Sequence, residues 1–361
     1  MGPIRILVDS FADEGLPNAQ MGNAREIICR LDPCRFHVTV FHLGRPDKYI
    51  ACRANTKLIQ LPKRRQTIRI LHEFLTGRHE ILFYLKASPA SKWYLQLRRK
   101  WKDSRIIVGT IESRSDLHNE PTIGSDGIAL WEQTVLLSDY LFSNSQAVRR
   151  NLEKEYGITS DVVPTGVDTK FFTSDFERTT NLRPRVLFTG SLRPFKQPQL
   201  LLQAAARFPL ADFIIVGDGM MRDELKRRII QEKLANVMLM GPLLGENLKT
   251  EYQKADIFLF PSSWEGSPKV ILEAAASGLP VIARRNYQPE TVVDSETGYL
   301  VANDEELFFR LGLLLDSAVL RRELGRAGRR HSELFDWGVI THRWEEIFLQ
   351  LVSERRTECV A

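Results

Sequence analysis

Two glutamates, Glu265 and Glu273, interrupt a stretch of the chain that otherwise carries mostly small and apolar side chains. The stretch reads E-G-S-P-K-V-I-L-E-A-A-A-S-G-L-P over residues 265–280. Carboxylates are rarely buried unless they are paired or bind something. The pair has two interpretations. One is an acid stabilised by a helix dipole followed by a glutamate that faces solvent; the other is two carboxylates that bind the hydroxyl groups of a ligand.

Local signals in the same stretch predict the elements that hold these glutamates. Ser267 is a suitable N-cap, Pro268 suits the first helical position, and Gly278 suits the residue that follows a helix. We therefore expect a short, buried helix over residues 269–276. The apolar run before it, residues 255–261, is typical of a strand. A strand, a short loop and a helix N-terminus in this order present backbone N–H groups to a phosphate.

This stretch resembles the E-x7-E signature of the retaining glycosyltransferases of family 4, within the glycosyl transferases group 1. The family has the GT-B fold, an α/β architecture of two Rossmann-like domains that face each other across a cleft. The resemblance implies that Glu265 lies by the sugar of a nucleotide-sugar donor, with the N–H groups of Gly266 and Ser267. It also implies that Glu273 accepts hydrogen bonds from the ribose hydroxyls.

A second loop carries cations that a departing diphosphate needs. The family uses a G-R-x-x-x-x-K-G loop, and this chain reads G-S-L-R-P-F-K-Q over residues 190–197. Gly190 and Lys196 match the family, whereas Ser191 stands where an arginine is usual. We expect Lys196 to bind the diphosphate and Arg193 to replace the missing arginine, because preorganised charge is commonly the largest catalytic contribution. The alternative is that both cations are ordinary loop residues.

Further donor contacts follow from the resemblance. Gly217 and Gly219 would let the backbone approach the nucleotide, although strand-end glycines occur in any doubly wound sheet. The backbone near Met240 would pack on the base. Gly22, in a loop after the first strand, is the best match to a family glycine near the donor phosphates. That loop lacks G-x-G-x-x-G, which argues against a nicotinamide-binding dehydrogenase.

The acceptor side departs from the family pattern. After the strand predicted over residues 105–110, the family usually has a histidine that touches the donor or the acceptor, and here Glu112 occupies that position. Glu112 would either orient an acceptor hydroxyl or sugar, or be a rim residue or salt-bridge partner. His118 lies further along the chain and is the second acceptor candidate. Thr165 is another departure, because it replaces a usual asparagine.

Length and composition fit a two-domain architecture. The chain has 361 residues, of which 43% are hydrophobic and 26% charged, enough for two separate cores. We expect an N-terminal acceptor-binding domain over residues 1–175 and a nucleotide-sugar-binding domain over residues 183–340. By resemblance, the last helix, residues 341–361, crosses back to the N-terminal domain. The resemblance is detailed over residues 140–350 and thin before them.

Positive charge is concentrated in one segment. Residues 45–105 hold 16 basic and 4 acidic side chains. Within residues 89–102 a predicted helix places Trp93, Leu97 and Trp101 four residues apart, with cations beside them. An aromatic stripe with a cationic border can lie on an anionic membrane surface; the alternative is that the stripe packs on the sheet and the cations are solvated. No nucleic-acid-binding module accompanies the charge, so we expect no nucleic-acid partner.

Compartment and cofactors are read from further features of the sequence. There is no run of about 18 apolar residues, the first residues lead directly into a strand, and the four cysteines form no C-x-x-C pair. We therefore expect a cytoplasmic protein, peripheral on the inner face of the membrane if the aromatic stripe binds there. No D-x-D lies near a strand end, so we expect no metal and no cofactor beyond the donor substrate.

The resemblance implies a hexosyltransferase-type enzyme that moves a sugar, with retention of anomeric configuration, from a nucleotide-diphosphate sugar to a hydroxyl of a glycan or lipid-linked glycan. Glu265, Lys196 and Arg193 would be its catalytic residues. Two alternatives remain open: a non-catalytic nucleotide-sugar-binding partner subunit, and a GT-B nucleotide-sugar epimerase. The first is favoured by the departures from the family, which are Ser191, Gln197, Thr165 and Glu112.

Overall fold

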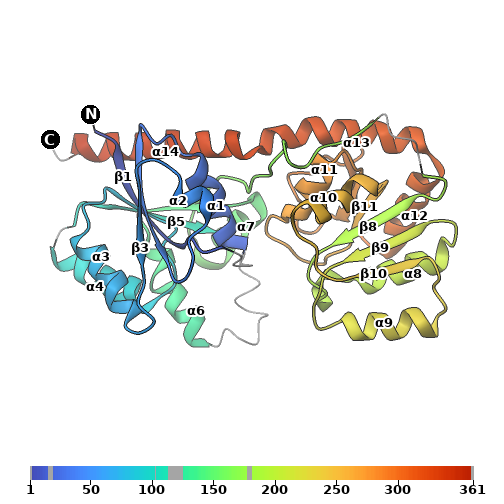
Figure 1. Ribbon diagram of the computed structural model, residues 1–361, viewed down its shortest axis with the longest axis horizontal. Coiled ribbons are helices and arrows are strands. Elements are labelled where there is room, and N and C mark those ends of the chain that lie inside the picture. Colours follow the sequence, from blue (N-terminus) through green and yellow to red (C-terminus); the bar gives the residue numbers. More distant parts are fainter. Residues whose placement is uncertain (1, 15–18, 102, 113–124, 177–180, 359–361) are drawn as a thin grey trace. The chain divides into compact units, whose positions relative to one another are not determined.

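The computed structural model describes residues 2–14, 19–101, 103–112, 125–176 and 181–358 (Figure 1). Its contacts divide the chain into two compact units, Met1–Thr165 with Trp337–Ala361, and Gly166–Asp336. The sequence analysis placed the end of the first domain at residue 175 and the end of the second at residue 340, whereas the contacts divide the chain after Thr165 and after Asp336. Each unit is an α/β domain built on a parallel sheet.

The first unit contains a seven-stranded sheet in the order β3-β2-β1-β4-β5-β6-β7. All of its neighbouring strands pair in parallel. Its strands are β1 (Ile4–Phe11), β2 (Phe36–His42), β3 (Thr56–Gln60), β4 (Ile81–Phe83), β5 (Ile106–Ile111), β6 (Tyr140–Ser143) and β7 (Asp161–Val162).

Helices cover both faces of this sheet, which is why its strands are apolar throughout. Successive side chains of β1 alternate between the faces: Ile6 packs in the cluster that includes α1 and α14, and Leu7 packs in the cluster that includes α3 and α4. The helices of this unit are α1 (Ala19–Arg30), α2 (Lys48–Ala51), α3 (Gln66–Thr76), α4 (Pro89–Trp101), α6 (Ser125–Glu132), α7 (Gln146–Tyr156), α14 (Trp337–Glu358) and the 3₁₀ turn η1 (Val135–Leu137).

The C-terminal helix α14 belongs to the first unit, as predicted. It packs against α1. Its aromatic residues fill the core under β4, with the ring centroids of Trp344 and Phe348 lying 4.8 and 5.0 Å from that of Phe83. Buried aromatic pairs of this kind add to the free energy gained from area burial alone.

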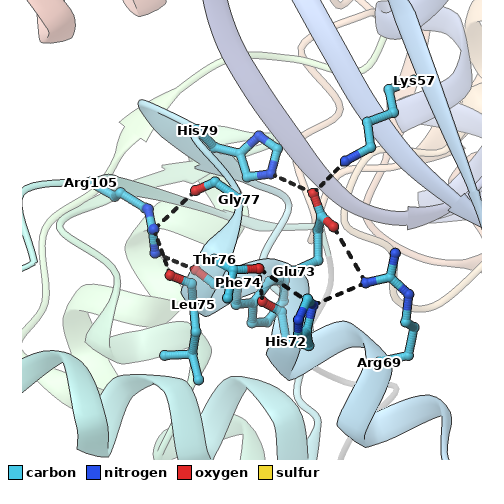
Figure 2. A network of polar contacts seen from close by, with 10 residues as sticks. All are labelled: Lys57, Arg69, His72, Glu73, Phe74, Leu75, Thr76, Gly77, His79 and Arg105. Carbon is cyan, nitrogen blue, oxygen red and sulfur yellow. Dashed lines mark hydrogen bonds and ion pairs between the residues drawn. The ribbon is translucent and has the colours of Figure 1, made fainter.

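A polar network closes the end of α3 in the first unit (Figure 2). The buried Glu73 carboxylate accepts hydrogen bonds from Lys57 Nζ at 3.0 Å and His79 Nε2 at 3.1 Å. The Arg105 guanidinium donates to the carbonyls of Leu75 and Gly77, each at 3.0 Å. Arg105 therefore satisfies carbonyl groups that the end of a helix leaves without partners.

The second unit contains a six-stranded parallel sheet in the order β10-β9-β8-β11-β12-β13. Its strands are β8 (Arg185–Thr189), β9 (Asp212–Val216), β10 (Val237–Met240), β11 (Ile257–Phe260), β12 (Val281–Arg284) and β13 (Gly298–Val301). Its helices are α8 (Gln199–Arg207), α9 (Arg222–Gln231), α10 (Gly245–Lys254), α11 (Lys269–Ala276), α12 (Asp304–Asp316), α13 (Ala318–Ser332) and the 3₁₀ turns η2 (Pro194–Lys196) and η3 (Glu333–Phe335).

This is the strand order of a Rossmann fold, which confirms the predicted class of two Rossmann-like domains. Strands β8, β9 and β10 follow one another from the middle of the sheet to one edge. The chain then returns to the middle, and β11, β12 and β13 follow one another to the other edge. Ligands of open parallel sheets bind beyond the carboxyl ends of the strands at the point where the order reverses. In the second unit that point lies between β8 and β11.

Two local predictions about helix N-termini were wrong. Helix α1 begins at Ala19, so Gly22 lies in its first turn and not in a loop. Helix α11 spans the predicted residues, Lys269–Ala276, but Pro268 is extended with ψ at 109° and is not the first helical residue, and no side chain caps the helix, so Ser267 is not its N-cap. The other end of α11 is as predicted: Gly278 has a φ of 76°, and backbone bonds from Gly278 N–H and Leu279 N–H form a Schellman motif.

Candidate active site

An ion pair joins the two loops at the switch point of the second sheet. The Lys196 ammonium, after β8, contacts the Glu265 carboxylate, after β11. The two side chains are only 15% and 11% exposed. The ammonium also lies 5.1 Å from the centre of the Phe260 ring. The sequence predicted separate roles for these residues, with the diphosphate and with the sugar, and the structure brings them together.

Backbone hydrogen bonds fix the two loops that carry the pair. Ser263 N–H and the Ser263 hydroxyl both donate to the Phe195 carbonyl, at 2.7 and 3.0 Å. The Ser262 hydroxyl donates to the Trp264 carbonyl at 3.0 Å. Because Phe195 and Trp264 are the residues just before Lys196 and Glu265, these bonds position both charged groups.

The glycines of the site allow the protein's own loops to approach each other. A Cβ at Gly217 would collide with the carbonyl oxygen of Gly190, and one at Gly219 would lie 2.7 Å from that of Leu192. All three glycines have positive φ, at 146° to 154°. Loop packing therefore accounts for Gly217 and Gly219 without a ligand, and their contact with a nucleotide stays a prediction.

Arg193 lies in the same loop as Lys196. Its side chain is exposed, and its carbonyl accepts from the backbone N–H of Lys196 at 3.0 Å. Lys196 is thus the last residue of the 3₁₀ turn η2 and Arg193 the residue before this turn, both in the segment that follows β8. The substitution of Arg193 for the family arginine stays a prediction.

Glu273, the second glutamate of the pair, is tied to the end of β8. The buried Tyr252 hydroxyl donates to Glu273 Oε2 at 2.9 Å, and the Thr189 hydroxyl lies 2.7 Å from the same phenol oxygen. Burial raises the pKa of the Glu273 carboxyl, and the Tyr252 hydrogen bond opposes this shift. The charge of Lys269 also acts on this half-buried carboxylate and opposes the rise of its pKa.

The remaining donor candidates lie at the same edge of the sheet, with one exception. Gly266, which is buried, and Ser267 lie in the loop before α11. Met240 is the last residue of β10, and the carbonyl after it, of Gly241, accepts from Gly217 N–H at 3.3 Å. The exception is Gly22, which lies in α1 of the first unit.

Two site residues, Arg284 at the end of β12 and Tyr287 shortly after it, were missed by the sequence analysis. Arg284, 7% exposed, donates to the Pro261 carbonyl and to Gln197, both at 3.3 Å, and pairs with Asp304, so it links the loops of Lys196 and Glu265. The only signal was an arginine at the end of an apolar strand.

Tyr287 is the second residue missed. Its side chain is 3% exposed, and its hydroxyl has no hydrogen-bond partner within the described residues. Burial, and then the charge of Glu265, raise the pKa of Tyr287 well above its usual value. The phenol therefore lies close enough to Glu265 for its charge to be felt, which no local sequence pattern indicated.

In the first unit, Glu112 is part of a hydrogen-bonded group. Its Oε1 accepts from the Tyr84 hydroxyl at 2.9 Å and from Asn23 Nδ2 at 2.8 Å. Burial, followed by the charge of Glu112, raises the pKa of Tyr84 well above its usual value. These three side chains line a small hollow. The other acceptor candidate, His118, lies outside the described residues.

The aromatic stripe of α4 faces outward. Trp93 and Trp101 are 44% and 64% exposed, whereas Tyr94 and Leu95 are buried against the domain. The two tryptophans of the stripe are therefore not buried against the sheet, whereas Leu97 between them is half-buried. Arg98 is held by Asp139 at 2.7 Å, while Arg99 and Lys100 remain exposed. No described helix is long and apolar enough to span a bilayer.

Comparison with known sequences finds a family model that matches most of the second unit. Residues 183–317 match the model of the family described as Glycosyl transferases group 1. The D-inositol 3-phosphate glycosyltransferase of Corynebacterium diphtheriae is 30% identical over 247 residues, covering 60% of this chain and 57% of that protein. The sulfoquinovosyl transferase SQD2 of Arabidopsis thaliana is 31% identical over 168 residues, covering 44% and 32%. The chain spans less than two thirds of the length of the curated relatives it matches.

Solved structures show similarity over nearly the whole chain. The sucrose-phosphate synthase (tll1590) of Thermosynechococcus elongatus has a TM-score of 0.78 at 18% identity, covering 98% of this chain and all of that one. Anabaena Alr3699/HepE, solved with UDP and glucose, has a TM-score of 0.75 at 16% identity, covering 95% of this chain and 98% of that one. At such identities the similarity establishes the fold.

Proposed function

Because its C-terminal domain belongs to the group 1 glycosyl transferases and the chain has the GT-B fold, we propose that this protein is a retaining glycosyltransferase. It would move a sugar from a nucleotide-diphosphate sugar to a hydroxyl of a glycan or lipid-linked glycan. The relatives carry glycosyltransferase names, and Alr3699/HepE binds UDP and UDP-glucose, so a uridine diphosphate donor is the first to test.

The single observation that supports this function best is the pair formed by Lys196 and Glu265 at the switch point. A diphosphate that bound Lys196 would compete with Glu265 for the ammonium. Glu265 would then be left partly buried and without a cation, which costs free energy unless hydrogen-bond donors replace it. A nucleotide sugar supplies both groups side by side: anionic phosphates for the lysine and sugar hydroxyls for the carboxylate.

The other residues of the edge complete a donor site in this proposal. Glu273, oriented by the Tyr252 hydrogen bond to its Oε2, would accept from the ribose hydroxyls with Oε1. Arg193 would add a second cation for the diphosphate. Contacts to the donor would also come from Gly190, Gly217, Gly219, Met240, Gly266, Ser267 and, in the first unit, Gly22.

The proposed reaction exchanges one bond of the anomeric carbon for another. The bond from this carbon to the diphosphate oxygen breaks, and a bond to the acceptor oxygen forms on the same face. The acceptor's proton passes to the leaving phosphate oxygen. Lys196 and Arg193 would stabilise the charge that grows on the diphosphate, an effect worth several kcal/mol in a preorganised site. Neither a metal nor a further cofactor enters this scheme.

The test is binding of UDP, GDP and ADP to the purified protein, followed by transfer and hydrolysis assays with the matching sugar nucleotides. A ligand that binds only the native state raises the melting temperature. We expect one diphosphate to do so, with turnover of its sugar form lost in Glu265→Gln. If none of the three shifts the melting temperature, the donor site is wrong. Tight binding without turnover on any acceptor would instead identify a partner subunit, and product without acceptor an epimerase.

We also propose that the outward face of α4 binds an anionic membrane, where a lipid-linked acceptor would be found. Trp93 and Trp101 supply exposed aromatic rings and Arg99 and Lys100 supply charge, as interfacial helices require. Flotation with phosphatidylcholine vesicles, with and without phosphatidylglycerol, is the test. Binding should need the anionic lipid and be lost in a Trp93→Ala/Trp101→Ala variant but not in Phe309→Ala, an exposed aromatic control. If equal amounts of protein floated with both vesicle types, the proposal that α4 binds an anionic membrane would be contradicted.

A further inference from the structure

The phenol of Tyr287 is buried at the edge of the candidate active site, and its hydroxyl is not used by any contact there. The side chain is only 3% exposed, and within the described residues the hydroxyl has no hydrogen-bond partner. Proteins rarely leave a buried hydroxyl in this condition, because the group has lost its hydration and gained nothing in exchange. A buried phenol at this place therefore suggests that the hydroxyl has a partner in another state of the site.

Hydrogen bonds hold the turn that carries Tyr287 against the loop that carries Glu265. Asn286 Nδ2 donates to the carbonyl of Ser263, two residues before Glu265, and Asn286 Oδ1 accepts from Tyr287 N–H at 3.1 Å. The next residue, Gln288, has a φ of 43°, which a residue other than glycine rarely adopts. Such a conformation persists where the surrounding structure enforces it, so the position of Tyr287 beside the Glu265 loop is fixed.

The groups that act on the phenol show which of them can accept its proton. Burial, and then the charge of Glu265, raise the pKa of Tyr287, whereas the backbone N–H and the charge of Arg284 oppose this rise. Arg284 offers only donors on these groups, so it can act on the phenol oxygen but cannot accept from the O–H. Of the two charged residues that act on the phenol, Glu265 is therefore the one that can accept a hydrogen bond from it.

The Lys196 ammonium occupies Glu265 in the structure. We propose that the Tyr287 hydroxyl donates to the Glu265 carboxylate when a diphosphate takes Lys196 away, which makes Tyr287 a positioning residue of the donor site. This inference rests on the proposed function, since donor binding starts the exchange. Hydrogen bonds to charged groups are the stronger class, so the phenol offsets part of the cost of separating the ion pair. It also holds one carboxylate oxygen and leaves the other for a sugar hydroxyl.

The first experiment needs no ligand, because Lys196→Ala also leaves Glu265 without its cation. In the wild-type protein, Tyr287→Phe should leave the melting temperature unchanged or raise it, since the hydroxyl that it removes has no partner. In Lys196→Ala the same substitution should lower the melting temperature by about 2 °C or more, because a hydrogen bond to a charged group is lost. In Lys196→Ala/Glu265→Ala this loss should disappear.

Tyr94→Phe is the matched control for the melting experiment. The Tyr94 hydroxyl donates to Asp103 at 2.8 Å in the first unit, so its removal should have the same effect in all three backgrounds. A phenol that only fills space at position 287 would likewise give one effect in every background. The dependence of the Tyr287→Phe effect on Lys196 is therefore the signature of the proposed exchange.

The second experiment measures binding of UDP and UDP-glucose by isothermal titration calorimetry. UDP takes Lys196 without bringing a sugar hydroxyl to Glu265, so Tyr287→Phe should raise the Kd for UDP about 5–20-fold. UDP-glucose brings its own hydroxyls, and its Kd should rise by about threefold or less.

The proposal is overturned if Tyr287→Phe changes the melting temperature equally with and without Lys196, or if the variant binds UDP as tightly as the wild type. It is also overturned if the loss in Lys196→Ala persists after Glu265→Ala, because the phenol would then have another acceptor. A wild-type protein that binds no UDP would count against the proposed donor, whereas the melting experiment would still decide whether Tyr287 bonds to Glu265. The two failures are therefore distinguishable.

Discussion

The two sheets share one strand order but differ in what occupies the point where that order reverses. In the second unit, charged side chains from the two flanking loops, Lys196 and Glu265, meet there. In the first unit, between β1 and β4, the backbone N–H of Lys86 donates to the Asp9 carboxylate at 2.9 Å, and the Lys86 ammonium lies 4.1 Å from the centre of the Phe11 ring.

The first switch point is therefore occupied by the protein's own groups. Burial raises the pKa of Asp9, against the opposing charge of Lys86, and burial lowers the pKa of Lys86. Two described polar atoms that lack partners, Asn23 Oδ1 and Asn144 Oδ1, belong to residues that line the hollow beside Glu112, whereas others, such as Ser10 Oγ on β1, lie elsewhere in the first unit. Strand order thus indicates where a crevice can form, but the side chains decide whether it is available to a ligand.

The largest expected effect tests the second switch point. Lys196→Ala should lower kcat/KM for transfer from the sugar nucleotide by about 10²–10³-fold, because a preorganised cation on the leaving group is lost. Steady-state kinetics with the donor found in the binding screen measures it. Lys226→Ala, which removes an exposed lysine on α9, is the matched control and should leave the rate unchanged. An equal loss in both variants would contradict a specific role for Lys196.

An effect of intermediate size is expected on the Kd for UDP, which should change when Glu273 is substituted but not when Asp9 is. Glu273→Gln keeps a group that accepts from Tyr252 but removes the charge offered to the ribose, so the Kd for UDP should rise about tenfold. Asp9→Asn, at the switch point of the first sheet, should change that Kd by less than about twofold, because Asp9 and Glu273 share no described hydrogen-bond partner. Isothermal titration calorimetry measures the Kd for UDP in both variants. An equal rise in Kd would contradict the proposed difference between the switch points of the two sheets.

The smallest effect concerns the polar network of α3, away from both switch points (Figure 2). Burial lowers the pKa of His79, against the opposing Glu73 hydrogen bond. Burial alone would raise the pKa of Glu73, but bonds from Lys57 and His79 outweigh it and the pKa is lowered. The unfolded chain therefore binds more protons at both groups, and the free energy of unfolding should fall as the pH drops below about 6.5 and continue to fall below about 4.5.

Thermal melts from pH 8 to pH 4 measure this dependence. We expect the melting temperature to be lower by a few degrees at pH 5.5 than at pH 7.5, and His79→Gln to reduce that difference. Lys196→Ala, which leaves this network intact, should melt with the wild-type pH dependence. A melting temperature that rises on acidification between pH 7.5 and 5.5 would show that the sign of the His79 contribution is wrong.

Much of the fold could be read from local sequence. The first residues were expected to lead directly into a strand, which is β1, and Gly278 was expected to follow the end of α11, which is Ala276. The spacing of Glu265 and Glu273 led to a resemblance to the glycosyl transferases group 1, and the model of that family matches residues 183–317. These features succeed because a strand, a helix end or a short motif depends on neighbours in the chain.

The errors arose where the outcome depends on distant residues. The outward face of α4 was not predictable, because Trp93 and Tyr94 both suit a buried face and only packing on α3 selects the latter. The start of α1 was missed, since its first five residues include Gly22 and Asn23, which are more typical of loops.

By itself, the sequence determined the alternation of strands and helices, the helix that carries Glu273, and the residue types available for phosphate and hydroxyl chemistry. Only the tertiary structure decided their partners: Lys196 for Glu265, 69 residues apart, Tyr252 for Glu273, and Tyr84 with Asn23 for Glu112. The physical reason is that a parallel sheet brings the carboxyl ends of strands from distant parts of the chain to one edge. Pairing there depends on strand order and loop geometry, which no local pattern contains.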